Sequence, residues 1–173
     1  MTEIKMMTSA YANKILKKLN EDKEFWLEKE RDSYVYEAAV GEEPVVPEYD
    51  FEEVNRNIDE IDCNIVRIKH AINLANVTNT IKFGDKELTV DAVLVRMAQL
   101  SRRKSMLDNM RKQQPKTRTG MSYAPTGRNA VPEYRYINYD LELAKKEYER
   151  IDKEITEMQI ALDKYNQTVE FEV

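Results

Sequence analysis

The sequence has little of several residues on which many folds and active sites depend. Its 173 residues include one cysteine, one histidine, four glycines and five prolines. A single cysteine excludes an internal disulfide framework. The scarcity of glycine and proline favours long helices over sheets or disorder. No apolar run approaches the 18 residues of a membrane span, and residues 1–7 lack the apolar core of a signal peptide. We therefore expect a cytoplasmic protein without a membrane segment.

Charged residues are abundant in this chain. They make up 34% of the sequence, and the net charge is −5. A chain of this length suits one domain, which we assign to residues 1–173. The acidic balance argues against nucleic-acid binding over the whole surface.

Two segments repeat an apolar residue at intervals of three and four, the spacing of a coiled-coil seam. The first seam consists of Phe51, Val54, Ile58, Ile61, Ile65, Ile68, Ile72 and Ala75. The second consists of Leu141, Ala144, Tyr148, Ile151, Ile155, Met158, Leu162 and Tyr165. We predict an all-α fold with four long helices in antiparallel hairpins, as a coiled-coil-like bundle, at about residues 9–40, 50–76, 90–113 and 140–166.

Local signals predict where these helices begin and end. Thr8 or Ser9, Asp50, Thr89 and Asp140 are good N-caps, and Gly41 is placed to end the first helix. Alternating residues around Gly84-Asp85 predict a short β-hairpin over residues 80–89. Residues 133–139 and 169–173 also alternate like strands. Between the third predicted helix and residues 133–139 we expect a basic loop over residues 114–131. A loop of this length is usually functional or disordered.

The helix predicted at 50–76 carries a second stripe with almost no charge. It consists of Cys63, Val66, His70, Asn73 and Val77. The corresponding stripe of the helix at 140–166 is Lys146, Glu149, Lys153 and Thr156, which suits water. A helix uncharged on two faces is usually covered on both. We therefore place helix 50–76 centrally and helix 140–166 at the edge, and we expect the second stripe to meet either the first helix or another copy. A homo-oligomer is the natural cover.

The residue types needed for catalysis or for metal binding are poorly represented. Cys63 and His70 lie two helical turns apart, about 10.5 Å, too far to share one metal ion or to form a nucleophile and its base. The sequence holds no Ser–His–Asp or HExxH pattern. We predict no enzymatic activity, no metal and no cofactor.

Positive charge is concentrated in one segment. Residues 96–132 carry nine Lys and Arg with Asp108 as the single acid. The acid-rich first two helices can neutralise part of this charge. The remainder, beside tyrosines, suits a phosphate-bearing ligand, because arginine binds phosphate bidentately and tyrosine stacks on bases. Histidine and asparagine near the end of helix 50–76 either set helix register or bind a ligand. The candidate ligand-binding residues are Arg102, Arg103, Arg118, Arg128, Tyr134, Arg135, Tyr136, His70 and Asn73.

Several motifs resemble a family of small, uncharacterised helical proteins of bacteria and prophages, some of which are labelled septicolysin. The resemblance rests on residues 68–76 with Thr78, Gly84-Asp85 before Leu88-Thr89, residues 100–107, residues 134–140, and the run Tyr148, Ile151 and Ile155. It implies a helical and oligomeric protein, in some members of phage origin. The label itself denotes a cytolysin, which conflicts with the absence of a secretion signal and of membrane-inserting segments.

Three functional hypotheses follow from these patterns. The first is a non-enzymatic oligomeric scaffold that binds a protein partner. The second is an oligomer that sequesters an anionic signalling nucleotide at a subunit junction through the basic segment 96–135. The third, nucleic-acid binding, is the weakest because the protein is acidic.

Overall fold

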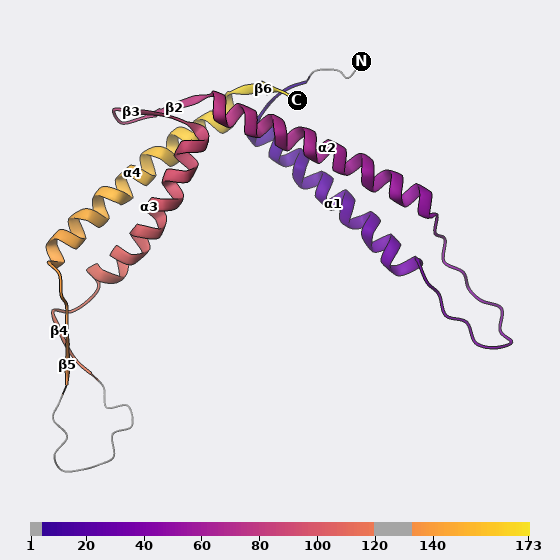
Figure 1. The fold of residues 1–173 in the computed structure, drawn as a ribbon, viewed down its shortest axis with the longest axis horizontal. Helices are drawn as coiled ribbons and strands as arrows, with labels where there is room; N and C mark the ends of the chain where they lie inside the picture. The colour runs from indigo at the N-terminus through magenta and orange to yellow at the C-terminus, as the bar shows by residue number, and fades with distance from the viewer. Residues whose placement is uncertain (1–4, 120–132) are drawn as a thin grey trace, which may run out of the picture.

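The protein has four long helices arranged as two pairs that diverge from a common apex, as the computed structural model shows (Figure 1). The structure describes residues 5–119 and 133–173. Helices α1 (Ser9–Ser33) and α2 (Phe51–Thr78) form the first arm, and helices α3 (Val90–Arg111) and α4 (Leu141–Thr168) form the second arm. The prediction of a mostly helical chain is confirmed. In one copy, however, the four helices do not surround a single axis.

Each arm is held together by its own core. In the first arm Ala12 and Leu16 of α1 pack with Ile65, Ile68 and Ala75 of α2. The second arm has a larger core, formed mainly by Val93, Leu100, Leu107, Ala144, Ile151, Met158 and Leu162. Both predicted seams are therefore buried, fully or in part, with the exception of Phe51, which is 61% exposed.

The apex is built from two short antiparallel ribbons. Strand β1 (Met6–Thr8) pairs with β6 (Glu170–Glu172), and β2 (Thr80–Phe83) pairs with β3 (Lys86–Thr89). Phe171 of β6 enters the core of the first arm, while Phe83 of β2 enters that of the second. The predicted hairpin at residues 80–89 and the predicted pairing of the C-terminal strand are both confirmed. The tight turn uses Gly84 at φ +53°, a conformation that favours glycine.

Three of the predicted N-caps make the expected side-chain hydrogen bonds. Thr8 accepts from the backbone N–H of Tyr11, Asp50 from Glu53, and Asp140 from Glu142 and Leu143. Thr89 precedes α3 but makes no side-chain cap bond. At the other end of α2, the side-chain amide of Asn79 donates to the Ala75 carbonyl at 2.8 Å and to the Tyr165 hydroxyl at 3.4 Å. This second contact links the two arms at the apex.

Helix α1 ends at Ser33, so the prediction that it continues to Val40 is wrong. Residues 34–50 form an extended connector. Tyr34, Val35 and Tyr36 are 52–62% exposed, and such aromatic and β-branched residues favour helix only weakly when packing does not support them. Gly41 does adopt a positive φ, +90°, but within a turn of this connector.

The predicted basic loop at 114–131 is shorter than expected. Strand β4 (Lys116–Arg118) pairs antiparallel with β5 (Tyr134–Tyr136), which agrees with the strand-like alternation of residues 133–139. This β4–β5 ribbon extends the second arm beyond the ends of α3 and α4 (Figure 1). The rest of the predicted loop, residues 120–131, lies outside the described residues.

Replacement of Met158 by alanine should destabilise the second arm. Its side chain is 0% exposed in the α3–α4 core, and truncation of such a residue costs about 2–5 kcal/mol. The matched control is Ile160→Ala on the same helix, because Ile160 is 66% exposed. Urea unfolding followed by circular dichroism measures both changes. Equal losses in the two variants would contradict the assignment of this core.

Candidate functional site

The β4–β5 ribbon brings together four of the predicted ligand-binding residues, which are Arg118, Tyr134, Arg135 and Tyr136. Arg118 lies opposite Tyr134, and Lys116 lies opposite Tyr136. Since alternate residues of a strand share a face, the side chains of these two cross-strand pairs occupy one face of the ribbon. Arg135 occupies the other face. The Lys116 ammonium is 4.1 Å from the ring centre of Tyr134 and 5.5 Å from that of Tyr136. The ribbon therefore presents an exposed surface of cations and tyrosines.

The ribbon is anchored to the second arm by polar contacts at its base. The Tyr139 hydroxyl donates to the carbonyl of Met110 at 2.6 Å. Arg111 lies with its guanidinium carbon 4.1 Å from the ring centre of Tyr148 and pairs with Asp108 at 2.7 Å. The Tyr139 contact joins the segment after β5 to the end of α3, and the Arg111 contact with Tyr148 joins α3 to α4 beside it.

Part of the predicted basic segment is neutralised within the second arm itself. Lys112 and Arg111 pair with Asp108 and hold the pKa of that carboxyl below its usual range. Lys104 pairs with Asp152 of α4, which raises the pKa of the lysine. We expected the acids of the first two helices to perform this role, so that expectation is wrong: the partners belong to α3 and α4. In contrast, no ion pair within the described residues engages Arg118 or Arg135.

The other predicted residues do not join the ribbon. Arg102 and Arg103 are exposed on α3, and Arg102 lies nine residues before the end of that helix, about 14 Å along its axis. His70 and Asn73 are exposed on α2 in the other arm. Arg128 lies outside the described residues. The nine candidates therefore do not form a single site in one copy.

The uncharged stripe of α2 is exposed along its length. We call Cys63, Val66, His70, Asn73 and Val77 the α2 stripe; all five side chains are exposed, with Val66 at 67% and Val77 at 51%. Helix α1 therefore does not cover it, and the prediction that α2 is central is wrong for a single copy. The corresponding stripe on α4 is exposed and charged, as expected.

The free end of the first arm contains an apolar hollow. It has a volume of about 620 Å³ and is lined by Leu27, Glu30, Arg31, Tyr34, Tyr49 and Phe51. The Tyr49 hydroxyl donates to a Glu30 carboxylate oxygen at 3.0 Å. Burial and the Glu30 carboxylate together raise the pKa of Tyr49. We call this feature the tip hollow; aromatic rings beside a carboxylate are suited to an organic cation.

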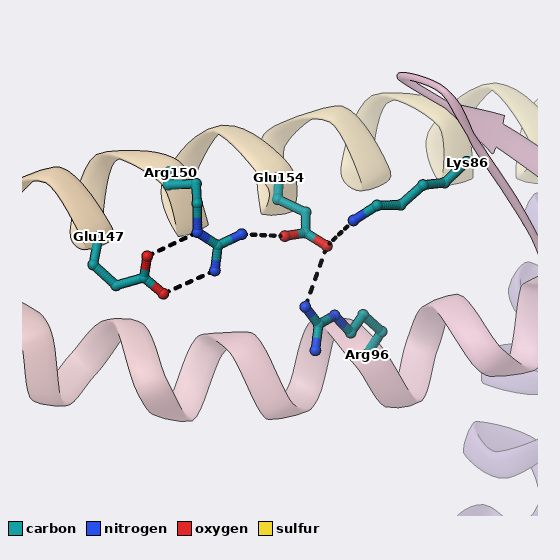
Figure 2. Close-up of polar contacts among 5 residues, drawn as sticks. All are labelled: Lys86, Arg96, Glu147, Arg150 and Glu154. Carbon is teal, nitrogen blue, oxygen red and sulfur yellow. Dashed lines mark hydrogen bonds and ion pairs between the residues drawn. The ribbon is translucent and has the colours of Figure 1, made fainter.

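A buried carboxylate joins the β2–β3 hairpin to both helices of the second arm. Glu154 of α4, 8% exposed, accepts from Lys86 at 2.9 Å, from Arg96 at 3.4 Å and from Arg150 at 3.0 Å. Arg150 also binds both oxygens of Glu147 at 2.8 Å (Figure 2). The three cations come from β3, α3 and α4, so this one acid connects three elements.

The cations around Glu154 stabilise its charged form. The hydrogen bond from Lys86 is the largest cause of a lowered pKa for Glu154, which burial opposes. The sequence reasoning missed this acid and treated the acids as exposed. A signal was present, because Glu147 and Glu154 occupy equivalent positions beside the seam, where coiled coils place interhelical ion pairs.

Among the described residues, no group of three or more His, Cys, Asp or Glu side chains is arranged to hold a metal ion. In the same part of the chain, no helix combines the length and the apolar character that crossing a membrane requires.

Comparison with known proteins identifies the fold and no function. No family model and no curated protein matches the chain. A solved structure, described as the crystal structure of a functionally unknown conserved protein from Corynebacterium diphtheriae, matches with a TM-score of 0.63 and 14% sequence identity. The match covers 96% of this chain and 99% of that chain. At this identity the likeness shows a shared fold alone.

Replacement of Glu154 by glutamine should destabilise the protein at neutral pH. The change removes the carboxylate that binds Lys86 and Arg96, whereas Arg150 keeps its pair with Glu147, and the loss should cost about 1–2 kcal/mol. The matched control is Glu21→Gln, whose exposed pair with Lys17 at 3.7 Å contributes little. Urea unfolding at pH 7 compares the two variants.

The effect of this substitution should depend on pH. Because the folded-state pKa of Glu154 lies below the ordinary value of 4.5, its carboxylate stabilises the fold above the unfolded-state pKa. This contribution is lost as the pH falls through the folded-state pKa. The difference between wild type and Glu154→Gln should therefore shrink below pH 4.5. A difference that stays constant from pH 7 to pH 3 would show that Glu154 acts without its charge.

Proposed function

We propose that the protein is a non-enzymatic, oligomeric binding or scaffold protein of the cytoplasm, whose copies associate through the α2 stripe. The observation that carries the proposal is the exposure of this stripe. The stripe is about 21 Å long from Cys63 to Val77. It contains no Asp, Glu, Lys or Arg, and Val66 and Val77 are exposed on it. Such a surface in water is typical of an interface between proteins.

A second copy is the cover that best fits the stripe. A twofold contact brings the same patch of both subunits together, so an uncharged patch meets an uncharged patch. It also buries the exposed Leu74, which lies beside the stripe and is 55% exposed. Pairing of this kind would place α2 in a bundle with its counterpart, and the coiled-coil-like bundle predicted from the sequence would then form between copies.

A second candidate function is the capture of an anionic nucleotide by the β4–β5 ribbon. The observation in its favour is the strand register, which puts Arg118 beside Tyr134 on one face. Arginine suits a phosphate, and tyrosine suits a base. The candidate ranks second because Lys116 already lies over both tyrosine rings, so a base would have to displace it.

Replacement of Val66 by lysine should weaken self-association about tenfold or more, because each copy would then bring an unpaired charge into the contact. Ile160→Lys is the matched control, since Ile160 on α4 is 66% exposed and Val66 is 67% exposed. Sedimentation velocity over a range of concentrations measures both dissociation constants. A wild-type protein that stays monomeric, or equal losses in both variants, would refute association through α2.

Nucleotide capture makes a separate prediction. The purified protein should show a raised 260/280 nm absorbance ratio and release a nucleotide detectable by mass spectrometry. Arg118→Ala should reduce the bound nucleotide about tenfold, since it removes a charged hydrogen-bond donor from the face that holds Tyr134. Arg102→Ala, on α3 away from the ribbon, serves as the control. Protein that purifies without nucleotide, and whose melting temperature no added nucleotide raises, would rule this candidate out.

A further inference from the structure

The two arms carry opposite charge at their outer parts. Residues 28–53, at the end of the first arm, contain ten Asp and Glu and two Lys and Arg. The described residues of 96–135, which run along α3 to the β4–β5 ribbon, contain nine Lys and Arg and two Asp and Glu. Four of these cations pair with acids of their own arm, namely Arg96, Lys104, Arg111 and Lys112. One chain therefore carries an acidic surface on the first arm and a basic surface, centred on the ribbon, on the second.

The two surfaces cannot neutralise each other within one copy. Helix α2 has 28 residues and α4 has 28 residues, so each arm is about 40 Å long. The arms diverge from the apex, and their free ends lie far apart (Figure 1). Salt screens exposed charges beyond about 10 Å. The attraction between the two surfaces can therefore act only between copies.

The acidic end also contains the tip hollow, which gives a cation a place to dock. Tyr34 and Phe51 are each 61% exposed, and Glu30 and Arg31 line the hollow with them. One Glu30 oxygen accepts from Tyr49, and the acids of the surrounding segment outnumber Arg31 and Lys29. Arginine stacks on aromatic rings and pairs with carboxylates. The connector also exposes Val45 at 90% and Val46 at 60%, so it offers apolar area to a partner.

The ribbon has the complementary features. Arg118 and Arg135 are exposed and project from its two faces without an ion pair in the described part of the chain. Tyr134 and Tyr136 are 42% and 62% exposed, and they offer apolar area to the valines of the connector.

We propose that the tip hollow of one copy binds the β4–β5 ribbon of a second copy, with arginine as the inserted cation. The contact deepens the proposed function, since it rests on self-association, and it uses a surface different from the α2 stripe. The stripe lies on the half of α2 nearest the apex, whereas the hollow lies at the opposite end of that arm (Figure 1). The two contacts can thus be lost independently.

A charge-reversal experiment tests the contact. Glu42→Lys/Glu43→Lys reverses charge on the connector, and Arg118→Glu/Arg135→Glu reverses it on the ribbon. Each double variant should associate about tenfold more weakly than wild type, because like charges then face each other. An equimolar mixture of the two should recover wild-type affinity, since each altered surface meets its opposite again. Sedimentation with one partner fluorescently labelled measures both results.

Two controls separate a docked contact from general charge attraction. Lys14→Glu/Lys18→Glu makes the same charge change on exposed positions of α1 and should leave association unchanged. Phe51→Ala changes no charge but removes a wall of the tip hollow, and it should weaken association severalfold. Equal loss in the Lys14/Lys18 variant, or no recovery in the mixture, would overturn the proposal.

The result also distinguishes this inference from the proposed function. Association through the hollow should weaken as NaCl rises from about 0.05 to 0.5 M, whereas association through the uncharged α2 stripe should not. If Val66→Lys abolishes all association while the charge reversals and salt do nothing, this inference is wrong and the α2 contact stands. If only the charge reversals and salt act, the α2 contact is wrong. A chain monomeric in every condition refutes both.

Discussion

Within the described residues, each long helix packs along its length against one other helix, and the rest of the structure depends on this constraint. A helix with a single partner can bury one stripe of side chains. On helix α4 the stripe that corresponds to the α2 stripe is charged and favourable in water, although Leu143 and Ile160 are exposed elsewhere on the helix. On helix α2 that stripe is uncharged, and Val66 and Val77 stay exposed on it, with Leu74 beside them. The second stripe of α2 therefore stays uncovered in the single chain.

The apex sets the geometry in which these faces are left open. The β1–β6 ribbon brings both ends of the described chain to the first arm, and the β2–β3 hairpin connects the arms in sequence. Glu154 ties that hairpin to α3 and α4 through charge-assisted hydrogen bonds, which are stronger than neutral ones. The two ribbons and the Asn79–Tyr165 contact lie at the apex, so they leave the outer surfaces of the two helix pairs accessible.

Local rules predicted much of this fold. The seams, the caps at Asp50 and Asp140, and the hairpin at Gly84-Asp85 depend on neighbours in sequence, so they could be read directly. The divergence of the arms could not, because a seam specifies that a helix has a partner without saying which partner or how many. The predicted first helix was too long for a similar reason. The local pattern did not reveal that Tyr34 to Val40 lack a surface to pack against. Of the candidate site, the ribbon residues came together through an alternation visible in the sequence, while Arg102, His70 and Asn73 were grouped by composition and lie elsewhere.

The distribution of charge is harder to explain for a solitary chain. Several cations of the second arm are already paired within it, as Lys104 is with Asp152 and Arg111 with Asp108, so the fold does not require the unpaired arginines of the ribbon. The connector likewise concentrates acids, of which only Asp50 caps a helix among the described residues. Gathering like charges costs stability through self-repulsion, and within one copy the distance between the arms prevents any compensation. The proposed contact between the acidic end of one copy and the basic ribbon of another would remove both penalties, and it would account for their occurrence on opposite arms.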